Sequence, residues 1–154
     1  MSKATEVLQQ LEEELNDYGL SSFDGIYTSF YLPIHNTDID LTPSRPVQMD
    51  VKQALWVSNQ MKNTRFCVLD GVAPVYSRTL LKKGGTLDVH INCPSIDVHN
   101  ELPDVIADTK VLLEKYARDL GFTPGLHHYN LIDAWIPWDY VRVFSPETNE
   151  EGWI

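Results

Sequence analysis

The chain has 154 residues, of which 43% are hydrophobic and 22% charged, so it is long enough to bury a core and is not composed like a disordered protein. Its 12 basic and 22 acidic side chains give a net charge of −10, which repels phosphates and anionic lipids and argues against sequence-specific nucleic-acid binding or attachment to a membrane. The first residues lack the apolar segment of a signal peptide, and no apolar run is long enough for a membrane span, so a cytoplasmic protein is expected.

The first half of the chain predicts one helix, one strand and one ambiguous segment. Apolar residues recur at three- and four-residue steps over 4–18, which predicts an amphipathic helix with Ser2 as a possible N-cap. Residues 26–34 are rich in aromatic and branched side chains and predict a strand. Residues 47–61 fit either an alternating strand or a helix capped by Asp50, and the pattern does not decide between them.

The middle of the chain predicts a strand followed by a hairpin. Residues 65–69 form a short apolar run, and the runs 75–81 and 86–93 flank Lys82-Lys83-Gly84-Gly85, a strong turn signal. On the second arm of this hairpin, Asp88 and His90 alternate with apolar residues and therefore share one face.

The last third of the chain predicts its clearest helix, over 104–120, which begins after Pro103 and ends at Gly121. Strands are expected over 131–136 and 140–144, followed by an acidic tail from about residue 146.

These elements predict a single α+β domain spanning 1–154. We expect a mainly antiparallel sheet, with the N-terminal helix and the helix 104–120 packed on one face.

The candidate catalytic residues are histidines near a hydroxyl or a carboxylate. His35-Asn36-Thr37 fits the His-x-Thr element of two-histidine phosphoesterases, and His90 is the nearest second histidine on a strand, although it lacks the hydroxyl. Asp88 and His90 are the alternative metal ligands of a hydrolase, but the spacing matches no known closed ligand set. The main prediction is therefore no catalytic set, no metal and no cofactor.

Other chemistries have less support in the sequence. There is no nucleophile elbow, and both Cys67 and Cys93 lie in apolar strands, where a thiol behaves as a small hydrophobic group. If the segment around His127-His128 is extended, the two imidazoles must point to opposite faces, so at most one of them joins any site.

Aromatic residues gather near the C-terminus, beside the acidic tail. Such side chains, with an arginine among them, are typical of protein–protein interfaces. The predicted interface consists of Trp135, Trp138, Tyr140, Arg142, Phe144 and Trp153.

The order of elements over residues 65–120 resembles the tail terminator, or tail completion, proteins of tailed bacteriophages. The likeness rests on the strand Thr86-Leu87-Asp88-Val89-His90-Ile91 and on Ile106-Ala107-Asp108 in the helix that follows it. The resemblance implies a structural subunit without catalysis, which forms a homo-oligomeric ring, usually a hexamer, and contacts other tail or neck proteins. The chain would then be found in the virion.

Three functional hypotheses follow from the sequence. The first is a structural assembly protein of a phage tail or neck, and the second is a small phosphoesterase or metal-dependent hydrolase that uses His35 and His90. The third is an acidic adaptor or inhibitor that binds a host protein. The sequence alone ranks the first above the third only through the resemblance.

Overall fold

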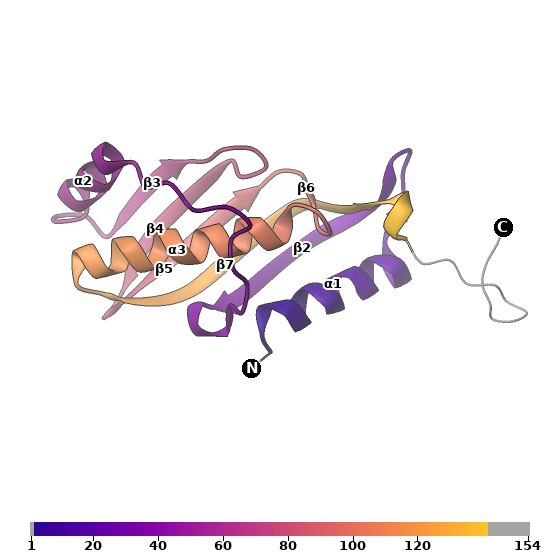
Figure 1. Cartoon of the computed structure of the whole chain (residues 1–154), viewed down its shortest axis with the longest axis horizontal. Helices are drawn as coiled ribbons and strands as arrows, with labels where there is room; N and C mark the ends of the chain where they lie inside the picture. The colour runs from indigo at the N-terminus through magenta and orange to yellow at the C-terminus, as the bar shows by residue number, and fades with distance from the viewer. Residues whose placement is uncertain (1, 142–154) are drawn as a thin grey trace, which may run out of the picture.

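The computed structural model describes residues 2–141 as one α+β domain (Figure 1). The chain folds in the order α1 (Ala4–Tyr18), β1 (Leu20–Ser21), β2 (Gly25–His35), η1 (Asn36–Asp38), α2 (Val51–Gln60), β3 (Phe66–Asp70), β4 (Ser77–Lys83), β5 (Thr86–Cys93), β6 (Ile96–Asp97), α3 (Leu102–Leu120), β7 (Thr123–Pro137) and η2 (Trp138–Tyr140).

Local sequence signals set the bounds of the helices. The carboxylate of Asp50 accepts hydrogen bonds from two backbone N–H groups in the first turn of α2, so the ambiguous segment becomes a helix rather than a strand. The N-cap of α1 is Lys3, one residue later than the predicted Ser2, and its N–H donates to Glu6. Gly121 ends α3 with a φ of 78°, a left-handed conformation that favours glycine.

The sheet follows the strand order β1-β2-β7-β5-β4-β3, with β6 beside β7. Four strand pairs are antiparallel, whereas β5 and β6 both run parallel to β7. Parallel strands need a long crossover, and α3 supplies it between β5 and β7. The sheet is therefore mainly antiparallel, as predicted, with a parallel centre.

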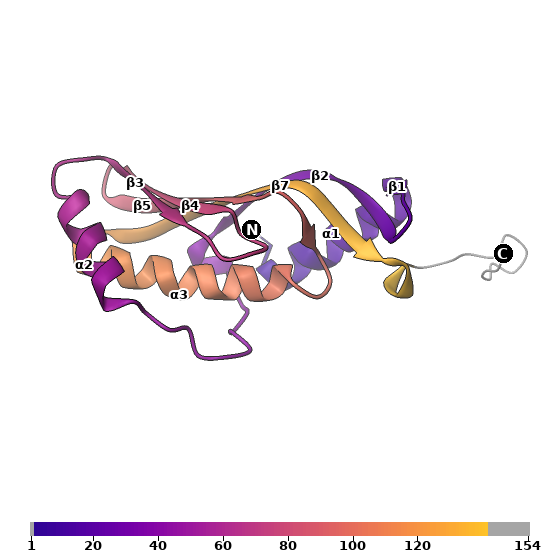
Figure 2. The same ribbon diagram turned by 90° about the horizontal axis from the view of Figure 1, so that it is seen from above.

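The three helices cover one face of the sheet and leave the other face open (Figure 2). On the covered face, buried strand residues pack against the apolar sides of α1 and α3, and Leu113 of α3 is only 1% exposed. On the open face, one row of paired residues crosses five strands: Val68, Thr79, His90, His128 and Pro33. Alternation along each strand separates the two sets of side chains.

The region of β7 differs from the prediction. This strand is 15 residues long and begins at Thr123, whereas the sequence predicted a strand only over 131–136. The strand expected from 140 to 144 is wrong at its start, because Trp138–Tyr140 forms a short 3-10 helix, η2. Residues 142–144 and the predicted acidic tail lie outside the described residues.

Candidate functional site

A cleft of about 660 Å³ lies on the covered side of the molecule. It has a volume within the range of roughly 300–1,000 Å³ that is common for sites that bind small molecules. Its walls are the segment 44–48, the loop 70–75 and the first half of α3. The polar groups at its lining are Ser44, Arg45, Gln48, Gln53, Asp70, Arg78, Asn100, Glu101, Asp104 and Asp108.

Arg78 is the best-placed cation of the cleft. It lies on β4 with its side chain on the covered face, and its Nε donates a 2.9 Å hydrogen bond to the hydroxyl of Thr109 on α3. Burial lowers the pKa of the guanidinium from its ordinary value. Among residues 2–141, neither Nη atom of Arg78 has a hydrogen-bond acceptor, and neither is fully buried. Both Nη atoms therefore remain available to a ligand in the cleft.

Two carboxylates one helical turn apart face the same cleft. Asp104 accepts hydrogen bonds from the hydroxyl (3.0 Å) and the N–H (3.3 Å) of Ser44. Burial, and then the charge of Asp104, raises the pKa of Asp108, while Arg78 and Arg45 act in the opposite direction. Asp108 is therefore easier to protonate than an ordinary aspartate, which suits a group that exchanges hydrogen bonds or a proton with a ligand.

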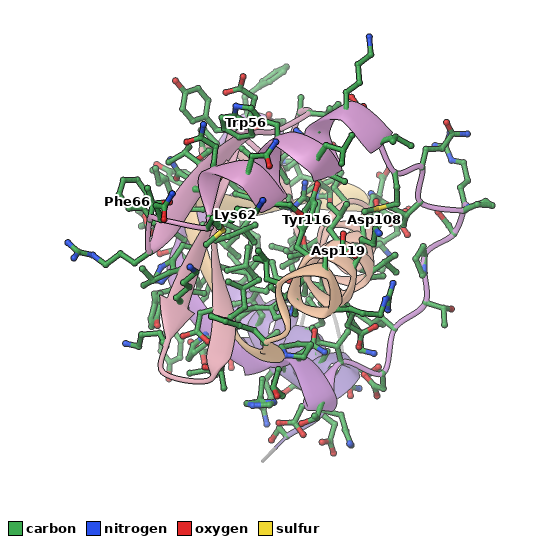
Figure 3. All side chains as sticks on the ribbon, turned by 90° about the vertical axis from the view of Figure 1, so that its left-hand side faces the viewer. Trp56, Lys62, Phe66, Asp108, Tyr116 and Asp119 are labelled. Atoms are coloured by element: carbon green, nitrogen blue, oxygen red, sulfur yellow. The ribbon has the colours of Figure 1, made fainter. Side chains whose placement is uncertain are left out.

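Figure 3 looks along α3 and shows Asp108 and Tyr116 on the flank of this helix that faces α2. The hydroxyl of Tyr116 donates to the side-chain oxygen of Gln53 on α2, at 3.2 Å. This bond joins α2 to α3 and holds one wall of the cleft.

The open face carries a second polar cluster, which includes two of the predicted site residues. Asp88 and His90 share this face, as the alternation predicted. The ring of His90 stacks on that of His128, with 4.2 Å between centroids, and the Nε2 of His128 lies 3.7 Å from Asp88. Tyr31 bonds the other nitrogen of His128 at 2.6 Å. Burial and His128 lower the pKa of His90.

This second cluster does not have the shape of a metal or substrate site. Stacked imidazole rings do not direct their nitrogens at a common point, and over 2–141 no group of three or more histidine, cysteine or acidic side chains is arranged to hold a metal ion. Asp88 is bonded instead to the backbone N–H of Leu126, at 2.9 Å.

The two halves of the phosphoesterase hypothesis do not come together. His35 bonds the hydroxyl and the N–H of Thr37, at 2.9 and 3.2 Å, and so caps η1. His35 lies on β2 and His90 on β5, and β7 runs between these strands. Because neighbouring strands are about 4.8 Å apart, the backbones at these two positions are separated by about 10 Å or more.

Three residues of the predicted aromatic interface lie in the part of the chain that the structure describes. Trp135 is half-buried on β7, and Trp138 and Tyr140 are exposed. The indole N–H of Trp138 contacts the carbonyls of residues 22 and 23, and Tyr140 stacks on His99 with 3.9 Å between centroids. Arg142, Phe144 and Trp153 lie outside the described residues.

The two cysteines are both buried on the covered face and are not joined in a disulfide. Burial raises the pKa of Cys67 and raises that of Cys93 to about 11. At neutral pH both are protonated thiols, which are poor nucleophiles.

The sequence did not predict the cleft, although one signal of it was present. Arg78 is two residues from Leu80, the buried position of β4, so the two side chains share a face. A cation placed on the apolar face of a strand is unusual and indicates a buried partner or a site.

No family model and no curated protein matches the sequence. The fold is similar to that of the thermostable thymidylate synthase A from Bacillus subtilis, with a TM-score of 0.66 and 13% identity over 84% of this chain and 78% of that one. At this identity the likeness shows a shared fold alone.

This likeness corrects the functional prediction. The expected role as a structural subunit of a phage tail or neck is wrong, because the fold is one that an enzyme uses. The pattern that suggested the phage role, a Gly-turned hairpin followed by a helix, occurs in many α+β domains.

No helix among residues 2–141 is long and apolar enough to cross a membrane.

Proposed function

We propose that the chain binds a small polar molecule in the cleft on its covered side, and that this molecule is a pyrimidine nucleoside or nucleotide. The observation that carries the proposal is the guanidinium of Arg78, which is fixed at its Nε and presents free Nη donors beside the carboxyl of Asp108.

The chemistry of the two groups matches a pyrimidine edge. A uracil or thymine ring presents carbonyl acceptors on either side of an N–H donor. The Nη atoms of Arg78 are donors, and the carboxylate of Asp108 is an acceptor, so together they complement such an edge. The likeness to a thymidylate synthase supports a pyrimidine as the first ligand to test.

The charges of the cleft favour the base over a phosphate as the recognised group. Two arginines, Arg45 and Arg78, face four acidic side chains, at positions 70, 101, 104 and 108. This excess of negative charge opposes a phosphate in the cleft. We therefore expect thymidine to bind at least as tightly as thymidylate.

Isothermal titration with thymidine and thymidylate tests the proposal. Arg78→Gln should weaken binding by about tenfold or more, because a hydrogen bond from a charged group contributes about 1.5–3 kcal/mol. Arg65→Gln is the matched control, since Arg65 is exposed and lies outside the cleft. If neither ligand binds at millimolar concentration, or if both variants bind like the parent, the proposal fails.

We further propose that a second copy of the chain covers the open face of the sheet. Exposed apolar and aromatic side chains gather there, including Tyr31, Phe66 and Val68, which are 61%, 52% and 49% exposed. The central row of this face carries no carboxylate or lysine, so two copies of an acidic chain repel each other least there.

Sedimentation velocity tests this association. Val68→Glu should shift the chain toward the monomer, because it places a carboxylate within the contact. Val51→Glu is the control, as Val51 is 71% exposed on α2, on the helix side. A parent chain that stays monomeric at 100-fold dilution and at high concentration alike would contradict the contact.

A further inference from the structure

Arg78 is a cation on the covered side of the sheet, and no carboxylate neutralises it. Its side chain shares the covered face of β4 with Leu80, which is 2% exposed. Several ion pairs join side chains of residues 2–141, and none of these pairs includes Arg78. A guanidinium that is withdrawn from water without a counter-ion is unfavourable, so the fold must hold this one by other means.

The hydroxyl of Thr109 is the group that holds the guanidinium. Nε of Arg78 donates to this oxygen at 2.9 Å, and Thr109 is 0% exposed in the layer between α3 and the sheet. The hydroxyl has one proton, which it donates at 2.7 Å to the carbonyl of Val105, one turn earlier in α3. Because this proton is used, the oxygen can only accept from Arg78. The helix itself therefore fixes the direction of the bond.

This bond decides which edge of the guanidinium meets the cleft. An arginine can offer a pair of N–H donors either from Nε and one Nη or from its two Nη atoms. Thr109 occupies Nε, so the first of these edges is closed. The two Nη atoms have no acceptor in the described part of the chain, and Arg78 lines the cleft. The cation is thus presented to the cleft end-on, through both Nη atoms.

The same turn of α3 carries the carboxyl group beside which Arg78 acts. Asp108 and Thr109 are consecutive in the helix, so their side chains project about 100° apart. Asp108 lines the cleft, whereas Thr109 is buried and does not. The opposite charges of Arg78 and Asp108 attract each other, yet they form no ion pair. Anchoring Arg78 at Thr109 keeps the two groups apart, which leaves both of them open to a ligand.

We propose that Thr109 is a positioning residue of the cleft, which holds the guanidinium of Arg78 by its Nε so that both Nη donors face the ligand. Thr109 does not touch the ligand itself, because it does not line the cleft. The inference rests on the proposed function only in giving Arg78 a ligand. The position of Arg78 in the free protein is testable without one.

Nuclear magnetic resonance of the arginine side chains tests the proposal in the free protein. In the parent, the Nε–H proton of Arg78 should exchange slowly with water, because it is bonded to Thr109, whereas its Nη protons should exchange fast. Arg65 is exposed and supplies an internal reference for fast exchange at every nitrogen. Thr109→Val keeps the shape of the side chain but removes the hydroxyl, so it should speed exchange at Nε of Arg78 by about tenfold or more.

Two further variants separate positioning from a general loosening of the buried layer. Thr109→Val should fold, because the backbone N–H of residue 109 still donates to the carbonyl of Val105 within the helix. Thr109→Ser keeps the hydroxyl without the methyl group, so exchange at Nε should stay at least half as slow as in the parent. Tyr116→Phe is the matched control, since it removes another buried hydroxyl of α3, which bonds Gln53. Loosening of the layer would speed exchange in this control as well.

The outcomes distinguish this proposal from the proposed function. Slow exchange at Nε in the parent, its loss in Thr109→Val and its retention in Thr109→Ser support the positioning role whether or not thymidine binds. Fast exchange at Nε or slow exchange at Nη in the free parent overturns it, and so does an equal change in Thr109→Val and Tyr116→Phe. A parent that shows slow exchange at Nε but binds no pyrimidine contradicts the proposed function alone.

Discussion

His127 and His128 are consecutive residues of β7, yet their surroundings have nothing in common. His127 is fully buried beneath α3, and both of its ring nitrogens are hydrogen-bonded. His128 lies on the open face, stacks on His90 and bonds Tyr31. One sheet therefore carries two kinds of polar group, one on each face. On the covered face each group needs a partner, whereas on the open face water can replace it.

The covered face should tolerate no unpaired charge. Leu113→Asp places a carboxylate in the layer between α3 and the sheet, where Leu113 is 1% exposed. The substitution should cost about 4 kcal/mol or more and unfold the domain. Circular dichroism during thermal melting measures this effect. Ile132→Asp, on the open face at 51% exposure, should leave the melting temperature nearly unchanged.

The two histidines themselves should differ by a smaller amount. His127→Leu leaves the oxygen of Asn36 and the hydroxyl of Tyr129 without their partner, and each buried loss costs about 1–3 kcal/mol, for a total of about 2–6 kcal/mol. His128→Leu should cost under about 1 kcal/mol, because Tyr31 can bond water instead. Urea unfolding of both variants measures the difference. Equal destabilisation would mean that the open face is also covered.

Sequence periodicity predicted the elements whose causes are local. The helix α1, the helix α3 and the hairpin of β4 and β5 follow from repeats and end signals that lie within each segment. The first half of β7 was not predicted, because Pro124 and Gly125 interrupt the pattern. Those residues are extended through pairing with β5 and β2, which are distant in the sequence.

In the candidate site, too, only the features whose causes lie within one segment were predicted from the sequence. The pairing of Asp88 with His90 on one face followed from alternation, and so did the opposite orientations of His127 and His128. The bond from His127 to Asn36 spans 91 positions in the sequence, and that from Arg78 to Thr109 spans 31. No spacing rule within one segment predicts such contacts, since the fold of the sheet and α3 creates them.

The buried imidazole should also make stability depend on pH. The pKa of His127 is about 3 in the folded state and about 6.5 when unfolded, so the unfolded chain binds more protons between these values. The free energy of unfolding should therefore be fully retained above about pH 6.5 and fall below it, by about 1.4 kcal/mol per pH unit.

Urea unfolding at pH 7, 6 and 5 measures this slope. In His127→Leu the slope should be much flatter, because the titrating group is gone. His90→Gln serves as the control, since His90 is exposed and its lowered pKa should contribute far less. An identical slope in His127→Leu and the parent would show that other groups cause the pH dependence.

The smallest expected effect comes from adding a hydroxyl to each face. Val89 and Val68 lie on β5 and β3, and their exposed fractions are 1% and 49%. Threonine has nearly the shape of valine, so Val89→Thr mainly buries a hydroxyl and should cost about 1–3 kcal/mol. Val68→Thr should change the free energy of unfolding by no more than about 0.5 kcal/mol in the isolated chain, because water bonds the new hydroxyl.

The proposed contact between two copies makes this expectation depend on the protein concentration. If a second copy covers Val68, urea unfolding at high protein concentration should show a cost for Val68→Thr that disappears on dilution, while the cost of Val89→Thr stays constant. A cost for Val68→Thr that is large at every concentration would mean that the open face is covered within a single chain.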